Sequence, residues 1–587
     1  MHKHTSKHFF ETLHKFSSSK CIKQFFALKG FWADLFFMTL LVLFIFGFFQ
    51  YAIQFMALLQ SKVEIDLSPW HLPLYAFFSL SRMLLAYGCS LIFSLIWGYW
   101  AAKDRMAEKF LIPLIDILQS VPILGFMPGL VLVLVSFFPY SNQGIELVAI
   151  LMIFTSQAWN MAFGVYHSIC IIPKEQIECS IEYGFSRWQR FRWLELPCST
   201  ISLIWNSIMS IAGGWFFLML SEAFQLGSRD FRLPGLGSYM SVAASKGDVG
   251  AMCFAIFAMI VLIVLLDQIV WRPLVIWSQK FRFESTSSSE ISESWFLNAL
   301  KTSFLSVILC KIGRFFAKKE LKKIPLPEGL FIYVSRIGLS ILFILIVVLG
   351  FYLVPPLKLI TKDQWLSLIH GLSLTFSRVM ICVLISTSIA LPLGLMIGLS
   401  KKLSATVRPF LQVAASFPAS LLFPVLLWFF KYTDIPLSIG SVVLMLAGTG
   451  WYVLFNIIAG VSAIPSDLRE VAKSFKYSRF QKFKWLYVPT IFPYLMTGII
   501  TATGGAWNTS IVAEYISYNG QVWTTPGLGS SVSLAAQEGN MSLLVASVLV
   551  MVVTVALWNY FVWLRLYHYS EKQDIFLLRF LLPCYLV

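Results

Sequence analysis

One polar segment occurs twice in this otherwise strongly apolar chain. Residues 173–197 read PKEQIECSIEYGFSRWQRFRWLELP, and residues 465–489 read PSDLREVAKSFKYSRFQKFKWLYVP. Matched residues in the two segments, such as Pro173 and Pro465, are separated by a constant 292 positions. The duplication extends further, because a PGLGS motif occurs at both 234–238 and 526–530. A shared register of this length predicts a fold built from two similar units.

The composition indicates that both units lie in a membrane. Of the 587 residues, 58% are hydrophobic and 13% are charged, whereas soluble domains carry about 25% charged residues. Apolar runs of membrane-spanning type recur along both copies. We therefore predict an all-α polytopic membrane protein of two parallel six-helix bundles with about 12 transmembrane helices. The expected spans lie near 34–58, 73–101, 111–137, 144–171, 198–224 and 249–276, and near 331–355, 366–399, 407–430, 436–462, 490–516 and 540–565.

The basic residues predict how the chain is oriented. The net charge is +16, and Lys and Arg cluster in alternate loops, including 103–109, 401–408 and both polar segments. The intervening loops near 140–145 and 518–540 have none. This asymmetry follows the positive-inside rule and favours a lipid bilayer, not nucleic acid, as the partner of the basic residues. Both termini and both polar segments are expected to be cytoplasmic.

The expected domain boundaries follow from this topology. We predict a basic cytoplasmic tail at 1–30, a first membrane domain at 31–279, a cytoplasmic linker at 280–329, a second membrane domain at 330–566 and a cytoplasmic or interfacial tail at 567–587. Within the linker, the apolar stretch 295–316 has basic flanks and is expected to form an interfacial helix. Proline pairs such as Pro122 and Pro418 predict a break in the third span of each domain.

No metal site or directly bound cofactor is expected. His2, His4, His8 and His14 could bind a metal ion, but they lie in a basic tail that is expected to be mobile. The nine cysteines form no CxxC pair.

The polar segments resemble the EAA loop of ABC importer permeases, whose pattern is E-A-A, three residues, G, nine residues and then I-x-L-P. The first copy gives Glu178-Cys179-Ser180, Gly184 and Leu194-Glu195-Leu196-Pro197 at this spacing. The second gives Glu470-Val471-Ala472, Lys476 and Leu486-Tyr487-Val488-Pro489. Lysine replaces glycine at 476, so the second loop is expected to turn differently or to dock less well if that position needs a positive φ.

The resemblance implies two fused permease domains that are driven by a separate cytoplasmic ABC ATPase dimer. The residues implied in coupling to the ATPase are Glu178, Gly184, Pro197, Glu470, Ala472, Lys476 and Pro489. The sequence has no Gly-Lys dipeptide and therefore no GxxxxGK[ST] phosphate loop, so ATP would be used by the partner and not by this chain. The family further implies an extracytoplasmic solute-binding protein and a bacterial-type inner membrane.

The segment GGAWNTSIVAEY (504–515), followed by PGLGS, resembles permeases of the nitrate/sulfonate/bicarbonate and taurine type. Arg82 of the first copy matches Arg378 of the second, and this pair of arginines together with the resemblance favours a small oxyanion as the solute. The candidate pathway residues are Arg82, Arg378, Trp215, Trp507, Asn508, Glu222 and Glu514. Buried charges in membranes mark pathways or structural ion pairs. The arginines could therefore line an anion path or pair with carboxylates, and the tryptophans could serve packing.

Two other classes of function remain open on the sequence alone. An ion-coupled secondary transporter can also be built from parallel repeats, but it needs a midplane site for the coupling ion, and no cluster of buried carboxylates is evident. A membrane enzyme needs an asymmetric catalytic cluster at one membrane face, and the sequence shows none.

Overall fold

The computed structural model describes residues 28–566, with gaps at 59–62, 121, 227–228, 282–293, 304–327, 465 and 564. The histidines of the N-terminal tail, the tail at 567–587 and most of the predicted interfacial helix lie outside the described residues. Of that helix, α14 (Trp295–Thr302) is described.

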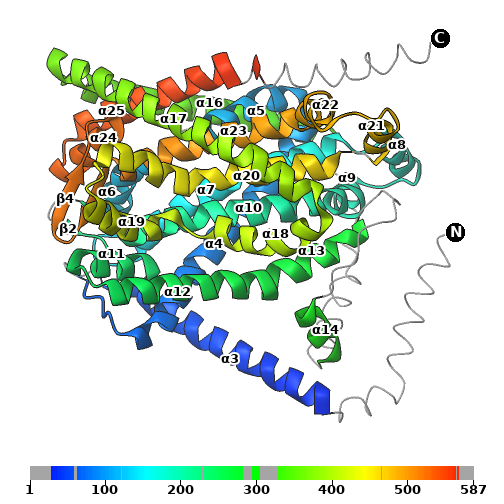
Figure 1. Ribbon diagram of the computed structural model, residues 1–587, viewed down its shortest axis with the longest axis horizontal. Coiled ribbons are helices and arrows are strands. Elements are labelled where there is room, and N and C mark those ends of the chain that lie inside the picture. The colour runs from blue at the N-terminus through cyan, green and yellow to red at the C-terminus, as the bar shows by residue number, and fades with distance from the viewer. Residues whose placement is uncertain are drawn as a thin grey trace. The chain divides into compact units, whose positions relative to one another are not determined.

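The described part of the chain is almost entirely helical, as expected. The first copy contains α3 (Leu28–Met56), η1 (Pro69–His71), α4 (Leu72–Lys103), α5 (Arg105–Ser120), η2 (Ile123–Phe126), α6 (Met127–Phe137), α7 (Gln143–Cys170), α8 (Lys174–Glu182), α9 (Arg187–Arg190), η3 (Phe191–Glu195), α10 (Leu196–Glu222), β1 (Gln225–Leu226), β2 (Arg229–Asp230), α11 (Leu236–Lys246), α12 (Val249–Leu266), η4 (Asp267–Trp271), α13 (Arg272–Ser278) and η5 (Gln279–Phe281). Figure 1 shows these elements in colours from blue to green.

The second copy repeats this order. It contains α16 (Glu328–Leu357), α17 (Lys362–Leu399), α18 (Lys401–Ser416), α19 (Ala419–Thr433), α20 (Leu437–Ala463), α21 (Ser466–Ser474), α22 (Arg479–Lys482), η6 (Phe483–Tyr487), α23 (Val488–Ala513), β3 (Tyr515–Tyr518), β4 (Gln521–Thr524), α24 (Leu528–Glu538), α25 (Met541–Trp558) and η7 (Asn559–Trp563). The strands form two antiparallel hairpins, β1–β2 and β3–β4.

The expected spans coincide with apolar helices. Within the described ranges, nine helices are long and apolar enough to cross a membrane. The helix pair Phe410–Ser416 and Ala419–Thr433 is apolar enough when taken together, and its two helices are bent by 85° at the break between them. Two shorter apolar helices, Ile123–Phe137 and Ile332–Val348, occupy the remaining expected positions. The third span of each copy is therefore broken, at Pro122 and at Pro418, because proline cannot donate the next helical hydrogen bond.

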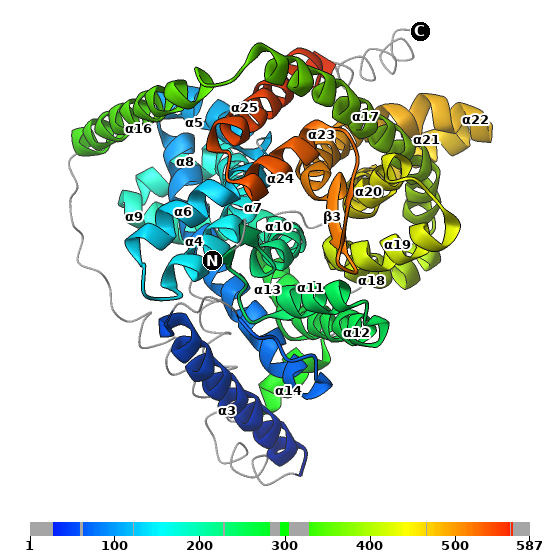
Figure 2. The ribbon, with the colours of Figure 1, turned by 90° about the vertical axis from the view of Figure 1, so that its left-hand side faces the viewer.

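The chain divides into two compact units that do not follow the duplication. The smaller comprises the described residues of Met1–Gln54, Ile171–Trp205 and Val264–Phe331. The larger comprises Phe55–Cys170, Asn206–Ile263 and the described residues of Ile332–Val587, and so holds membrane helices from both copies. In the larger unit α4 packs along α7, while α17, α20 and α23 pack together (Figure 2).

The first helix of the second copy packs on helices of the first copy. Within the larger unit, Leu339 and Leu342 of α16 lie against the buried residues Ala101, Ala107 and Leu111 of α4 and α5. The hydroxyl of Ser335 accepts a hydrogen bond from Trp100 Nε1 at 2.8 Å and donates one to the Asp104 carboxylate. These contacts tie the first helix of the second copy to the C-terminal end of α4 in the first copy.

Candidate functional site

The first polar segment forms two short helices joined by a tight turn. Helix α8 ends in a Schellman turn, in which the Gly184 amide donates to the Ile181 carbonyl at 2.8 Å and the Phe185 amide donates to the Ser180 carbonyl at 3.0 Å. Gly184 has a φ of +68°, the left-handed conformation that glycine adopts most easily. Helix α9 then starts at a capping box formed by Ser186 and Gln189.

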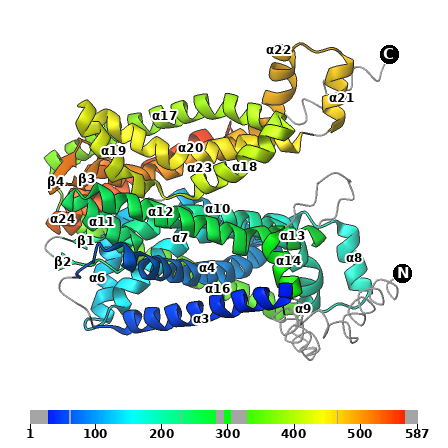
Figure 3. The same cartoon turned by 60° about the horizontal axis from the view of Figure 1, so that its bottom comes forward.

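The second polar segment repeats this geometry (Figure 3). The Lys476 amide donates to the Lys473 carbonyl at 2.9 Å, and the Tyr477 amide donates to the Ala472 carbonyl at 3.1 Å. Ser478 and Gln481 form the second capping box. Lys476 has a φ of 52°, so the chain makes the same turn with a lysine where the first copy has glycine. The prediction that the second segment turns differently is therefore wrong, because the backbone of the two turns is the same.

Both segments leave apolar and charged side chains on the surface. Glu178, Gly184, Glu470 and Lys476 are exposed, whereas Ala472 is buried. Large aromatic side chains beside them are also exposed, notably Tyr183, Trp188, Phe475 and Phe480. Exposed apolar surface rimmed by charged residues is typical of a protein-docking site. Pro197 and Pro489 are each the second residue of the long helix that follows, where proline is tolerated.

The matched arginines are held in ion pairs. Arg82 is fully buried and contacts Glu146 and Glu222, each at 2.7 Å. Arg378 contacts Glu514 at 2.7 Å. Glu146 has no acidic counterpart in the second copy, which is why the duplication gave no sign of its role.

The same networks fix the PGLGS loops. Glu222 accepts a hydrogen bond from the Gly237 amide at 2.8 Å, and Arg82 donates to the Pro234 carbonyl at 2.9 Å. In the second copy Glu514 and Arg378 bind Gly529 and Pro526 in the same way. A Cβ on Gly235 would lie 2.3 Å from the Glu222 carboxyl carbon, so this close approach requires glycine. None of the four matched charged residues lines the cavity described next.

A cavity of about 260 Å³ lies between the two copies inside the larger unit. Asn508 lines it, as do Gly213, Gly504 and Gly505, whereas the buried Trp215 and Trp507 do not. The other polar lining residues were not predicted from the sequence; they are chiefly Gln119, Ser156, Asn160, Asn206, Tyr452, Asn456, Thr497, Thr501 and Thr509. None of the described lining residues is charged.

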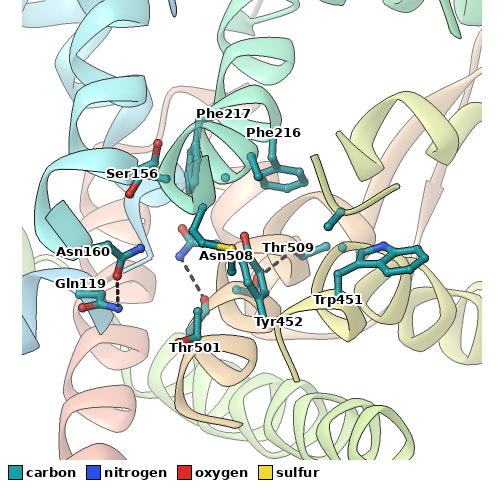
Figure 4. A pocket seen from close by; sticks show the side chains of 18 of the residues that line it. Gln119, Ser156, Asn160, Phe216, Phe217, Trp451, Tyr452, Thr501, Asn508 and Thr509 are labelled. Atoms are coloured by element: carbon teal, nitrogen blue, oxygen red, sulfur yellow. Dashed lines mark hydrogen bonds between the residues drawn. The ribbon is translucent and has the colours of Figure 1, made fainter. Parts of the chain in front are cut away.

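The polar side chains of the cavity come from both copies (Figure 4). Gln119 Nε2 donates to Asn160 Oδ1 at 3.2 Å. Asn508 Oδ1 accepts from the Ile123 amide of η2 at 2.8 Å, across the two copies. Aromatic rings, among them those of Phe216, Phe217 and Trp451, also line the cavity. These residues can hold a small polar solute by hydrogen bonds and by contacts with the aromatic rings. No described lining residue supplies a charge opposite to that of a charged solute.

Comparison with known proteins gives the family. The model of the binding-protein-dependent transport system inner membrane component family matches twice, at residues 94–270 and 390–572.

Individual relatives are more distant. The nitrate import permease protein NrtB of Synechococcus elongatus is 26% identical over 149 residues, which are 25% of this chain and 52% of NrtB. The bicarbonate transport system permease protein CmpB of the same organism is 26% identical over 182 residues, 31% of this chain and 62% of CmpB. The taurine transport system permease protein TauC of Escherichia coli is 23% identical over 166 residues, 28% and 57% of the two chains. The chain thus spans about half the length of the curated relatives that it matches.

Proposed function

Because the chain belongs to the family of binding-protein-dependent transport system inner membrane components, with two copies of the family domain, we propose that it supplies the whole translocation pathway of an ABC importer. The relatives are named as permeases for nitrate, bicarbonate and taurine, and we propose a small oxyanion-bearing solute for this chain too. The membrane is then a bacterial-type inner membrane with both termini in the cytoplasm.

The observation that carries this proposal is the pair of exposed helix–turn–helix segments. Both copies build the same Schellman turn and the same serine cap 292 residues apart. Both also expose aromatic side chains beside a glutamate, Glu178 or Glu470. Two equivalent docking elements suit two equivalent partner subunits. We propose that each segment docks on one subunit of a cytoplasmic ABC ATPase dimer.

The mechanism follows from this docking. ATP binding closes the ATPase dimer and moves both segments, and each movement passes into α10 or α23, which begin directly after π-helical turns η3 and η6. These two helices also contribute residues to the cavity. Their movement changes access to the cavity, while the buried arginine–glutamate pairs hold the PGLGS loops. An extracytoplasmic solute-binding protein delivers the solute. This chain itself catalyses no reaction.

Substitution of the docking residues tests the proposal. We expect Glu178→Ala and Glu470→Ala to lower ATP-dependent uptake and copurification with the ATPase about tenfold or more, because truncating a hot-spot residue of an interface costs about 2 kcal/mol or more and tenfold corresponds to about 1.4 kcal/mol. The matched control is Glu175→Ala, which removes an exposed carboxylate from the first turn of α8. Normal uptake in both variants, or uptake that survives ATP depletion and collapses with an ion gradient, contradicts the proposal.

A further inference from the structure

The cavity between the two copies has a specific set of free hydrogen-bonding groups. Asn160 accepts from Gln119 through Oδ1, so its Nδ2 amide has no acceptor among the described residues. The Tyr452 hydroxyl likewise has no hydrogen-bond partner in the described chain and lies at the cavity. Asn160 and Tyr452 occupy equivalent positions, 292 residues apart, directly after the matched Trp159 and Trp451. The two copies therefore each present one hydrogen-bond donor from the same place.

Another part of the lining presents acceptors. Thr497 and Thr501 lie one turn apart on α23, and Gly504 follows on the same face. The hydroxyl of Thr501 donates to the Thr497 carbonyl at 2.9 Å, and that of Thr497 donates to the Pro493 carbonyl at 3.0 Å. Each hydroxyl proton is thus used within the helix, and the oxygen lone pairs remain to accept. Thr509 and Ser156 are bonded to their own helices in the same manner.

We propose that this cavity binds a small solute that carries both an acid group and an N–H donor group. Asn160 and Tyr452 donate to the acid oxygens, and the threonine face of α23 accepts from the amine or ammonium. Nitrate has no donor to offer the threonines, and their lone pairs repel it. Bicarbonate has one O–H donor but no ammonium group to balance its negative charge. A zwitterion also suits a site in which no described lining residue is charged, because its net charge is zero and burying an unpaired charge is costly.

This inference rests on the proposed transport function and names its solute class. The test uses cells of the native host that lack the chain and re-express it, with radiolabelled taurine as the probe. The competitors are nitrate, bicarbonate and ethanesulfonate. Ethanesulfonate resembles taurine but has no amino group. We expect ATP-dependent uptake of taurine that excess unlabelled taurine inhibits at least tenfold more effectively than any of the three anions. Taurine uptake that is absent, or that ethanesulfonate inhibits as well as taurine does, overturns the inference.

Two isosteric variants separate the donor and acceptor groups. Tyr452→Phe removes one donor. We expect it to weaken the binding of taurine and the binding of ethanesulfonate about equally, by about tenfold or about 1.4 kcal/mol. Thr501→Val removes the acceptor lone pairs. We expect it to weaken the binding of taurine about tenfold and to change the binding of ethanesulfonate little. The matched control is Thr503→Val, since Thr503 has the same bond to its own helix, to Ile499, but does not line the cavity. Equal effects of Thr501→Val on the two solutes contradict the assignment.

Failure of the transport proposal gives a different result. If the chain is not an ABC permease, uptake of every probe is unaffected by Glu178→Ala and by ATP depletion. If only the solute class is wrong, uptake of nitrate, bicarbonate or ethanesulfonate still falls on ATP depletion and in Glu178→Ala. Taurine is then taken up no better than these anions.

Discussion

Lys476 adopts the left-handed backbone conformation that Gly184 adopts in the first copy, with φ values of 52° and +68°. For a residue with a Cβ, this conformation costs roughly 1 kcal/mol or more. The turn nevertheless forms, because the amides of Lys476 and Tyr477 close the same Schellman bonds as in the first copy. The second polar segment therefore holds backbone strain that the first does not.

Glycine at position 476 should relieve that strain. We expect Lys476→Gly to stabilise the turn by about 1 kcal/mol, seen as slower amide hydrogen exchange in 466–482. Lys473→Gly is the control, because Lys473 lies in the last turn of α21, where glycine should destabilise the helix by up to about 1 kcal/mol. Faster exchange in Lys476→Gly would show that the lysine side chain, and not its φ, governs the turn.

The buried ion pairs differ between the copies in one residue. Arg82 has two carboxylate partners, Glu146 and Glu222, whereas Glu514 is the one carboxylate that contacts Arg378 in the described chain. Removing one partner of a buried pair costs about 3–5 kcal/mol because the other charge stays buried. We expect Glu514→Gln to lower the unfolding temperature of the purified chain much more than Glu222→Gln does. An equal fall in unfolding temperature in the two variants would mean that Glu146 does not stabilise the charge of Arg82 once Glu222 is neutralised.

At the scale of elements, α16 is the helix that joins the second copy to the first. Burial raises the pKa of Asp104, but the hydrogen bonds from the Ser335 hydroxyl and the Met106 amide, with the charge of Arg336, bring it below its ordinary value of 3.8. A carboxyl with a lowered pKa stabilises the fold above its ordinary pKa and loses that contribution as the pH falls through the lowered value. The α16 contact should thus persist throughout the neutral range.

We expect Ser335→Ala to weaken this contact by about 1 kcal/mol, since it leaves the Trp100 indole and the Asp104 carboxylate without a partner hydroxyl. Protease susceptibility of α16 measures the effect. Ser340→Ala is the control, because the Ser340 hydroxyl is exposed and bonds only within α16, to the Arg336 carbonyl. Equal cleavage of both variants would show that apolar packing alone holds the helix.

At the scale of the whole molecule, contacts between the copies do not depend on the linker. Within the larger unit, Asn508 binds Ile123, and the Asn519 amide donates to the Ala244 carbonyl at 3.1 Å. A chain cut within 284–294 should therefore yield two fragments that copurify from the membrane. Recovery of either fragment without the other would contradict this expectation.

The duplication predicted much of this molecule, because residues that must be polar inside a membrane protein are conspicuous in its sequence. The segments at Glu178 and Glu470 and the break at Pro418 could be located from polarity and proline alone. The cavity could not, because Asn160, Tyr452 and Thr501 are single polar residues on apolar helices and the sequence does not say which way they face. The one signal for Asn160 and Tyr452 was their position, since each follows a matched tryptophan.

The fused architecture has a consequence for molecular recognition. Where two identical subunits meet at a central chamber, every chemical group on one wall has its twin on the other, so such a chamber favours symmetric or very small guests. Here one chain supplies both walls, and an amide at 160 faces the chamber together with a phenol at 452. Evolution can thus tailor the two sides separately and fit a guest whose two ends differ.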